Sequence, residues 1–124
     1  MNEIIMGTGA EEKGDVLDAL RRRYKEKGET IYEVTSVITE DDETEREVTF
    51  LFKKPTTASY DRYVKTASAS SSRALKTFIQ DNIVNEQEDE LKDMLEEYPA
   101  FSIGVGEKLL NMLGLSKTTT VKKL

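Results

Sequence analysis

The sequence contains no cysteine, no histidine and no tryptophan. Without cysteine, disulfide bonds and thiolate zinc sites are excluded, and without histidine the chain lacks the commonest general base and the commonest transition-metal ligand. Aromatic residues make up 7% of the 124 residues, which is a poor supply for a surface that stacks on single-stranded nucleic acid. We therefore expect a protein that is not an enzyme and that holds no metal or other cofactor.

Long apolar runs are also missing. No stretch approaches the roughly 18 residues of a membrane-spanning helix, and the first residues have no basic region of the kind that opens a signal peptide. The net charge of −6 opposes binding to duplex nucleic acid, because neutralising phosphates requires surplus lysine and arginine. We therefore expect an acidic, soluble, cytoplasmic protein with no membrane partner and no nucleic-acid partner.

The N-terminal part of the chain predicts one helix. Residues 1–9 are expected to be a loose leader, in which Ile4 to Met6 are candidates for a short edge strand. After this leader, apolar residues recur at helical spacing between Asp15, a candidate helix cap, and Gly28, which suits a helix C-terminus.

An antiparallel β-hairpin is predicted next. Residues 30–39 and 46–54 are two runs rich in β-branched and aromatic residues, separated by the acidic stretch 40–45. In the second run Val48, Phe50 and Phe52 share one face, and the opposite face is polar except for Leu51, which indicates a hairpin covered on one face. The acidic stretch lacks the glycine and the alternation of a calcium loop, so we expect a solvated turn.

The remaining sequence is helical in character. Pro55 is expected to end the second strand, and Thr56 or Thr57 to cap the helix that follows. Gly104 and Gly106, in the last predicted helix, favour a close helix–helix contact, with a local break of the helix as the alternative. Four helices are predicted, over residues 58–67, 73–84, 85–99 (with Asn85 as its cap) and 100–114.

These elements predict an α+β fold, in which an N-terminal helix and an antiparallel hairpin pack against a C-terminal bundle of about four helices. We expect one domain over residues 1–115, followed by a flexible basic tail at residues 116–124. The core is expected to contain Phe50, Phe52, Leu75, Phe78, Leu95 and Leu109.

Several features between residues 50 and 115 occur together in one known family. They are Phe52, Pro55 and Thr56; Tyr60 and Tyr63; Ile83 and Val84; Glu96, Glu97, Tyr98 and Pro99; and Gly106, Leu109, Leu110, Leu113 and Gly114. In this pattern the chain resembles the tail assembly chaperones of long-tailed bacteriophages and prophages. The shared features are packing positions, and none of them is catalytic.

The resemblance implies a protein of the bacterial host cytoplasm that binds the tail tape measure protein and keeps it soluble during tail tube assembly. Such a protein is absent from the mature virion. The implied partners are the tape measure protein and, as a second candidate, the tail tube protein. Two alternatives remain, a minor virion structural protein of the tail or connector, and a small acidic regulatory or inhibitor protein.

Two surfaces are predicted for these contacts. Opposed charges suit a head-to-tail contact between copies, which gives a ring or a spiral, although ordinary solvated helix faces explain the same charges. The last helix carries more apolar residues than one buried stripe needs, which favours a helix-in-groove contact with a client. The self-association residues are Arg21, Arg22, Arg23, Glu88, Glu90 and Asp93, and the client-binding residues are Leu109, Leu110, Met112, Leu113 and Leu115.

Overall fold

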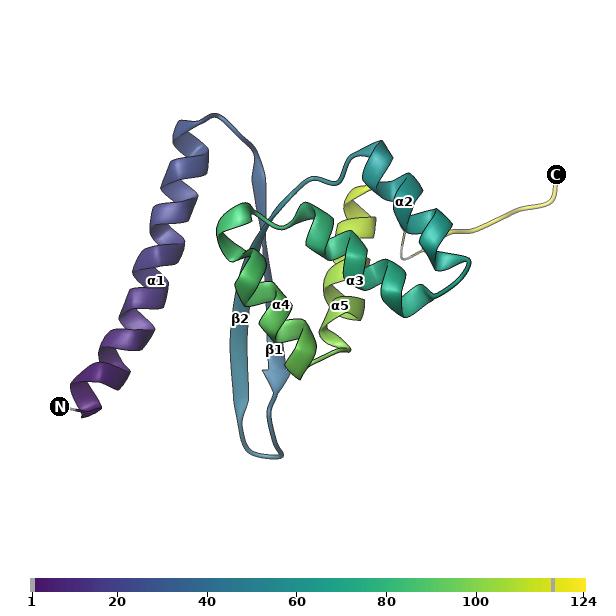
Figure 1. Ribbon diagram of the computed structural model, residues 1–124. Coiled ribbons are helices and arrows are strands. Elements are labelled where there is room, and N and C mark those ends of the chain that lie inside the picture. The colour runs from purple at the N-terminus through teal and green to yellow at the C-terminus, as the bar shows by residue number, and fades with distance from the viewer. Residues whose placement is uncertain (1, 117) are drawn as a thin grey trace. The chain divides into compact units, whose positions relative to one another are not determined.

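The computed structural model describes residues 2–116 and 118–124, and it describes residues 2–13 by their backbone alone. The chain falls into two compact units, Met1–Ile31 and Tyr32–Leu124, each of which is described by itself. The α+β prediction is confirmed, because a helix, a two-stranded antiparallel hairpin and four further α-helices follow one another along the chain. Figure 1 shows these elements. None of the helices in the described part combines the length and the apolar character needed to cross a membrane.

The first unit contains α1, Asn2–Glu26. The prediction of a loose leader with an edge strand is wrong, since the helix already includes residues 2–9. It also runs through Gly14, although glycine costs about 1 kcal/mol relative to alanine inside a helix. The predicted C-terminus is confirmed. Gly28 has a φ of 74°, and the N–H of Glu29 donates to the carbonyl of Tyr24 at 3.1 Å, as in a Schellman cap.

The hairpin consists of β1, Ile31–Thr39, and β2, Glu45–Lys53. The side chains of Thr35 and Thr49 meet across the strands, with 2.9 Å between their hydroxyl oxygens. The turn is held by the Asp41 carboxylate, which accepts hydrogen bonds from two backbone N–H groups at 2.8 Å each. These bonds hold the pKa of Asp41 below its ordinary value of 3.8, the bond from the N–H of Glu43 being the main cause. The turn residues are exposed, which confirms the predicted solvated turn.

The outer edge of β2 is covered by the segment that follows α3. The N–H of Val84 donates to the carbonyl of Leu51 at 3.0 Å, and Ile83 forms an antiparallel bridge with Phe52. The N–H of Leu51 in turn donates to the side-chain oxygen of the buried Gln87 at 2.7 Å. Leu51 is fully buried, although it points away from the face that carries Phe52. The neighbouring residues of that face, such as Val37 and Glu47, are exposed, so the prediction of a hairpin covered on one face holds except at Leu51.

The helices of the second unit begin close to the predicted positions. β2 stops at Lys53, just before Pro55, and Thr56 caps the next helix. The prediction that Asn85 caps a helix is wrong, because Asn85 begins a short 3₁₀ helix that places Gln87 against β2. The elements are α2, Thr57–Ala67; α3, Ser71–Asn82; the 3₁₀ helix Asn85–Gln87; α4, Glu88–Glu97; and α5, Phe101–Met112.

One apolar core joins the hairpin to α3, α4 and α5. Five of the six predicted core residues are buried, and Leu75 is half-buried. Leu75 lies instead under Gly106, where a Cβ atom would come within 2.7 Å of its side chain. The close contact predicted at Gly104 and Gly106 is therefore confirmed at Gly106, between α3 and α5, and is wrong at Gly104, where a Cβ atom would meet nothing within 4 Å. The predicted core residues that are buried are Phe50, Phe52, Phe78, Leu95 and Leu109.

Candidate functional site: a groove between α2 and α5

An open groove of about 470 Å³ lies between the start of α2 and the end of α5. No residue that lines it carries a charge, so the groove suits an apolar partner. α2 contributes Thr57, Tyr60 and Tyr63 to its wall, and the end of α5 with the residues just beyond it contributes Leu110, Leu113 and Leu115.

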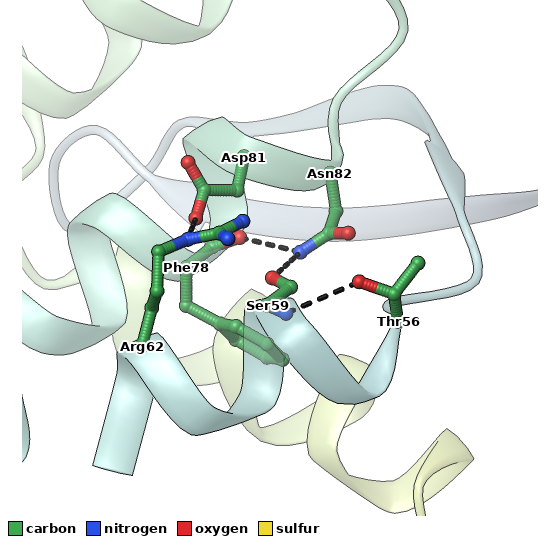
Figure 2. A network of polar contacts seen from close by, with 6 residues as sticks. All are labelled: Thr56, Ser59, Arg62, Phe78, Asp81 and Asn82. Carbon is green, nitrogen blue, oxygen red and sulfur yellow. Dashed lines mark hydrogen bonds and ion pairs between the residues drawn. The ribbon is translucent and has the colours of Figure 1, made fainter. Parts of the chain in front are cut away.

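The position of α2 is set at its first turn. Pro55 prevents β2 from continuing, and the Thr56 side chain accepts a hydrogen bond from the N–H of Ser59 at 3.1 Å. Figure 2 shows this cap. Because Tyr60 and Tyr63 are three residues apart on the helix that starts here, they lie on the same side of α2.

Two polar contacts fasten α2 to α3 (Figure 2). The side-chain amide of Asn82 donates to the hydroxyl of Ser59 at 3.0 Å and to the carbonyl of Phe78 at 2.8 Å, and Asn82 and Ser59 are both buried. The second contact is an ion pair between Arg62 and Asp81 at 3.4 Å, which is more exposed. A buried neutral hydrogen bond is more costly to break than an exposed ion pair, so Asn82 is the main polar anchor of α2.

An aromatic path leads from the core to the groove. The ring of the buried Phe78 lies 5.2 Å from the ring of Tyr63, and Tyr63 lies 6.3 Å from Tyr60. Tyr60 is 41% exposed. Aromatic pairs at such distances contribute about 0.5–1.5 kcal/mol beyond the area they bury. The groove wall on α2 is thus held from the core outward.

The other wall is formed where α5 ends. Gly114 has a φ of 105°, and the N–H of Leu115 donates back to the carbonyl of Leu110 at 3.1 Å. This Schellman cap turns the chain back over the last turn of the helix. As a result Leu115, which is 50% exposed, lines the same groove as Leu110.

The five predicted client-binding residues separate into three groups. Leu110, Leu113 and Leu115 come together in the groove. Met112 is half-buried against the core and does not line the groove. The prediction is wrong for Leu109, which is fully buried because it lies on the face of α5 that packs into the core.

The predicted self-association residues lie in two different units, and a contact between copies stays a prediction. The arginines belong to α1, where Arg21 pairs with Asp18 one turn earlier. The acidic residues belong to α4, whose start has no side-chain cap. Acidic side chains in a first turn complement the positive end of the helix dipole, which gives Glu88 and Glu90 a local role. Across the described side chains, no three acidic groups gather as they would around a metal ion.

Sequence reasoning missed the polar residues that place the site. Ser59, Asn82 and Gln87 are buried and hydrogen-bonded. Nothing in the spacing of Asn82 or Gln87 marks either residue as buried. The sequence did indicate that Ser59 is buried, because this residue lies three residues after the cap Thr56 and one residue before Tyr60, on an otherwise amphipathic helix.

Comparison with known proteins places this fold in a family. No curated protein sequence matches the chain. A solved structure, of the uncharacterised protein RBSTP2171 from Bacillus stearothermophilus, is similar to it with 27% sequence identity and a TM-score of 0.67. The similarity covers 86% of this chain and 99% of that one. A family model described as a domain of unknown function (DUF6848) matches residues 20–122, which include the hairpin, the four later helices and the groove. The protein therefore belongs to the DUF6848 family.

Proposed function

We propose that this protein is a tail assembly chaperone of a long-tailed bacteriophage or prophage, and that it holds the tape measure protein through the α2–α5 groove. The observation that carries this proposal is the composition of the groove. Leu110, Leu113 and Leu115, predicted from sequence as client contacts, share it with Tyr60 and Tyr63, the tyrosine pair of the pattern that resembles these chaperones.

The chemistry of the groove fits a helical client. A helix presents apolar side chains three and four residues apart, and an uncharged groove between two helices accepts such a face. Each apolar anchor that is fully buried contributes about 1.5–3 kcal/mol, while association costs about 4–15 kcal/mol. One groove therefore binds weakly. Many copies along a very long client hold it in solution, and each copy can leave when the tail tube forms.

The charge of the chain supports the same role. The net charge of −6 and the acidic first turn of α4, formed by Glu88, Asp89 and Glu90, keep a coated client soluble through mutual repulsion. In this proposal the protein works in the host cytoplasm and leaves before the virion is complete. The tail tube protein is a second candidate partner.

The test is co-expression with the tape measure protein. Leu115→Ser and Tyr60→Ser each remove one exposed anchor of the groove. Ile103→Ser is the matched control, because Ile103 is also an exposed apolar residue of α5, at 56%, and lies outside the groove. We expect both groove variants to lower the soluble fraction of the tape measure several-fold and the control to behave like the parent. Thermal melting of each variant checks that its fold is kept.

The proposal fails if Leu115→Ser maintains the client as well as the parent does, or if Ile103→Ser is equally damaging. Mass spectrometry of purified virions provides a second test. A chaperone is missing from the particle, whereas a minor structural protein of the tail or connector is present.

A further inference from the structure

The outer edges of the two strands of the hairpin differ in their hydrogen bonding. β2 is closed on its outer side by bonds from Val84 and Gln87 to Leu51, as described above. In the unit Tyr32–Leu124, no backbone partner is found on the outer side of β1 for Thr35 or Val37. Natural sheets protect such edges with lysine, proline or a covering segment. β1 contains no proline and no basic residue.

The register between β1 and β2 shows which backbone N–H and C=O groups of β1 point away from β2. The N–H of Glu40 donates to the carbonyl of Thr44 at 2.8 Å, so this pair is hydrogen-bonded. Because hydrogen-bonded and non-hydrogen-bonded pairs alternate along an antiparallel ladder, Ser36 bonds inward to β2, while Thr35 and Val37 direct their backbone groups outward. The bonds that Leu51 makes on the opposite edge agree with this alternation.

The apolar layer under the sheet continues to this edge. A second groove, of about 450 Å³, runs along β1. Four apolar or aromatic side chains, those of Val34, Ile38, Phe101 and Tyr98, line it together with Lys108 of α5. All four side chains are only partly buried against the core. A further strand added beside β1 would extend the sheet over this groove and cover these side chains.

We propose that β1 pairs in antiparallel fashion with β1 of a second copy, about a two-fold axis at Thr35, so that two hairpins form one four-stranded sheet. This inference does not rest on the proposed chaperone function. It describes a contact between copies that is different from the predicted contact between basic and acidic helices.

The sequence of β1 suits its own copy as the partner. A two-fold axis at Thr35 pairs all nine residues of each strand and keeps the core-side residues on one face, with Tyr32 opposite Ile38 of the other copy. Aromatic and β-branched residues are favourable cross-strand pairs. Glu33, the charged residue of the strand, lies opposite Val37. The two Glu33 side chains are then about 13 Å apart along the sheet, beyond the Debye length of about 8 Å at physiological salt.

Single cysteines test the register, since the chain has no cysteine of its own. In the proposed dimer the two Thr35 Cα atoms are about 5.5 Å apart, within the range that a disulfide spans. The two Val37 Cα atoms are separated by four residue steps, about 13 Å. We expect Thr35→Cys to form a covalent dimer under mild oxidation, at least tenfold faster than Val37→Cys, which is the exposed control. Equal rates, or no covalent dimer of Thr35→Cys, would overturn the proposal.

A second pair of variants tests the backbone contact in the unmodified protein. Val37→Pro removes an outward N–H, whereas Val37→Thr keeps it, and neither change removes a bond to β2. In sedimentation experiments we expect the proline variant to be monomeric at concentrations where the parent and the threonine variant are dimeric. Because the contact is made by backbone groups, the dimer should persist from low to high salt. A monomeric parent, or a proline variant that dimerises normally, would refute the pairing.

Discussion

Replacing Asn82 by leucine tests whether the buried hydrogen bond to Ser59 holds α2 in place. Leucine has a similar size but no polar atoms, so the change removes the donor and leaves the Ser59 hydroxyl buried. Ser59 is 3% exposed, and its bond from Asn82 measures 3.0 Å. Leaving one buried polar group without its partner costs about 1–3 kcal/mol. We expect Asn82→Leu to lower the free energy of unfolding by that amount.

The double variant, which combines Asn82→Leu with Ser59→Ala, tests whether the two side chains act through each other. Ser59→Ala alone should cost about 1 kcal/mol, since it removes one hydrogen bond. When both partners are apolar, no orphaned group is left, so the double variant should cost less than the sum of the two single changes by about 1 kcal/mol. Arg62→Ala is the comparison across the same pair of helices. Its ion pair with Asp81 is exposed, and such pairs contribute about 0–1 kcal/mol.

Urea unfolding followed by circular dichroism measures the free energy of unfolding of the parent and of the four variants. The dependence of this free energy on urea concentration should be the same in all of them, so that shifts of the midpoint report changes in stability. Strictly additive losses for Asn82→Leu and Ser59→Ala would show that the two side chains do not act through each other. A loss for Arg62→Ala as large as that for Asn82→Leu would contradict the ranking of the two contacts.

Three further outcomes are expected. Phe78→Ala should cost about 3–5 kcal/mol, because this ring is buried and carries the aromatic path; an unchanged melting temperature would remove Phe78 from the core. Gly104→Ala should stabilise the fold by about 0.5–1 kcal/mol, since a Cβ atom meets nothing there, while Gly106→Ala should gain less or lose stability because its Cβ would collide with Leu75. Asp41→Asn should be less stable than the parent at neutral pH. Because the folded pKa of Asp41 is lowered, its carboxylate stabilises the fold above the ordinary pKa, and the difference between the two proteins should vanish in acid as the pH falls through the folded pKa; a pH-independent difference between their urea midpoints would contradict this.

The elements that the sequence predicted well are those whose ends are set by local chemistry. Pro55 has no N–H to donate to a neighbouring strand, and Thr56 can cap a helix. The boundary between β2 and α2 can therefore be predicted from the sequence alone. Gly28 marks the end of α1 for a similar reason, because its left-handed conformation is costly for other residues. The predicted α+β class rests on such local signals.

Two of the errors occurred where a distant contact decides the outcome. Asn85 looks like a cap, but the chain there is drawn into a 3₁₀ turn so that Gln87 reaches Leu51, 36 residues earlier. Leu109 and Leu110 are adjacent in sequence, and the packing of α5 against the core alone determines which of them is buried and which lines the groove. Helical spacing cannot resolve that choice when apolar residues are present on several faces.

The closing of the β2 edge has a consequence for the order in which the chain folds. During synthesis the hairpin leaves the ribosome before the segment around Val84 and Gln87 that completes its edge. Until that segment arrives, both edges of the two strands are open, and a lone hairpin is marginal in water. Contacts so distant in sequence form slowly, since a long loop must close first. The nascent hairpin is thus exposed to misassembly along both edges until Gln87 has left the ribosome and the β2 edge is closed.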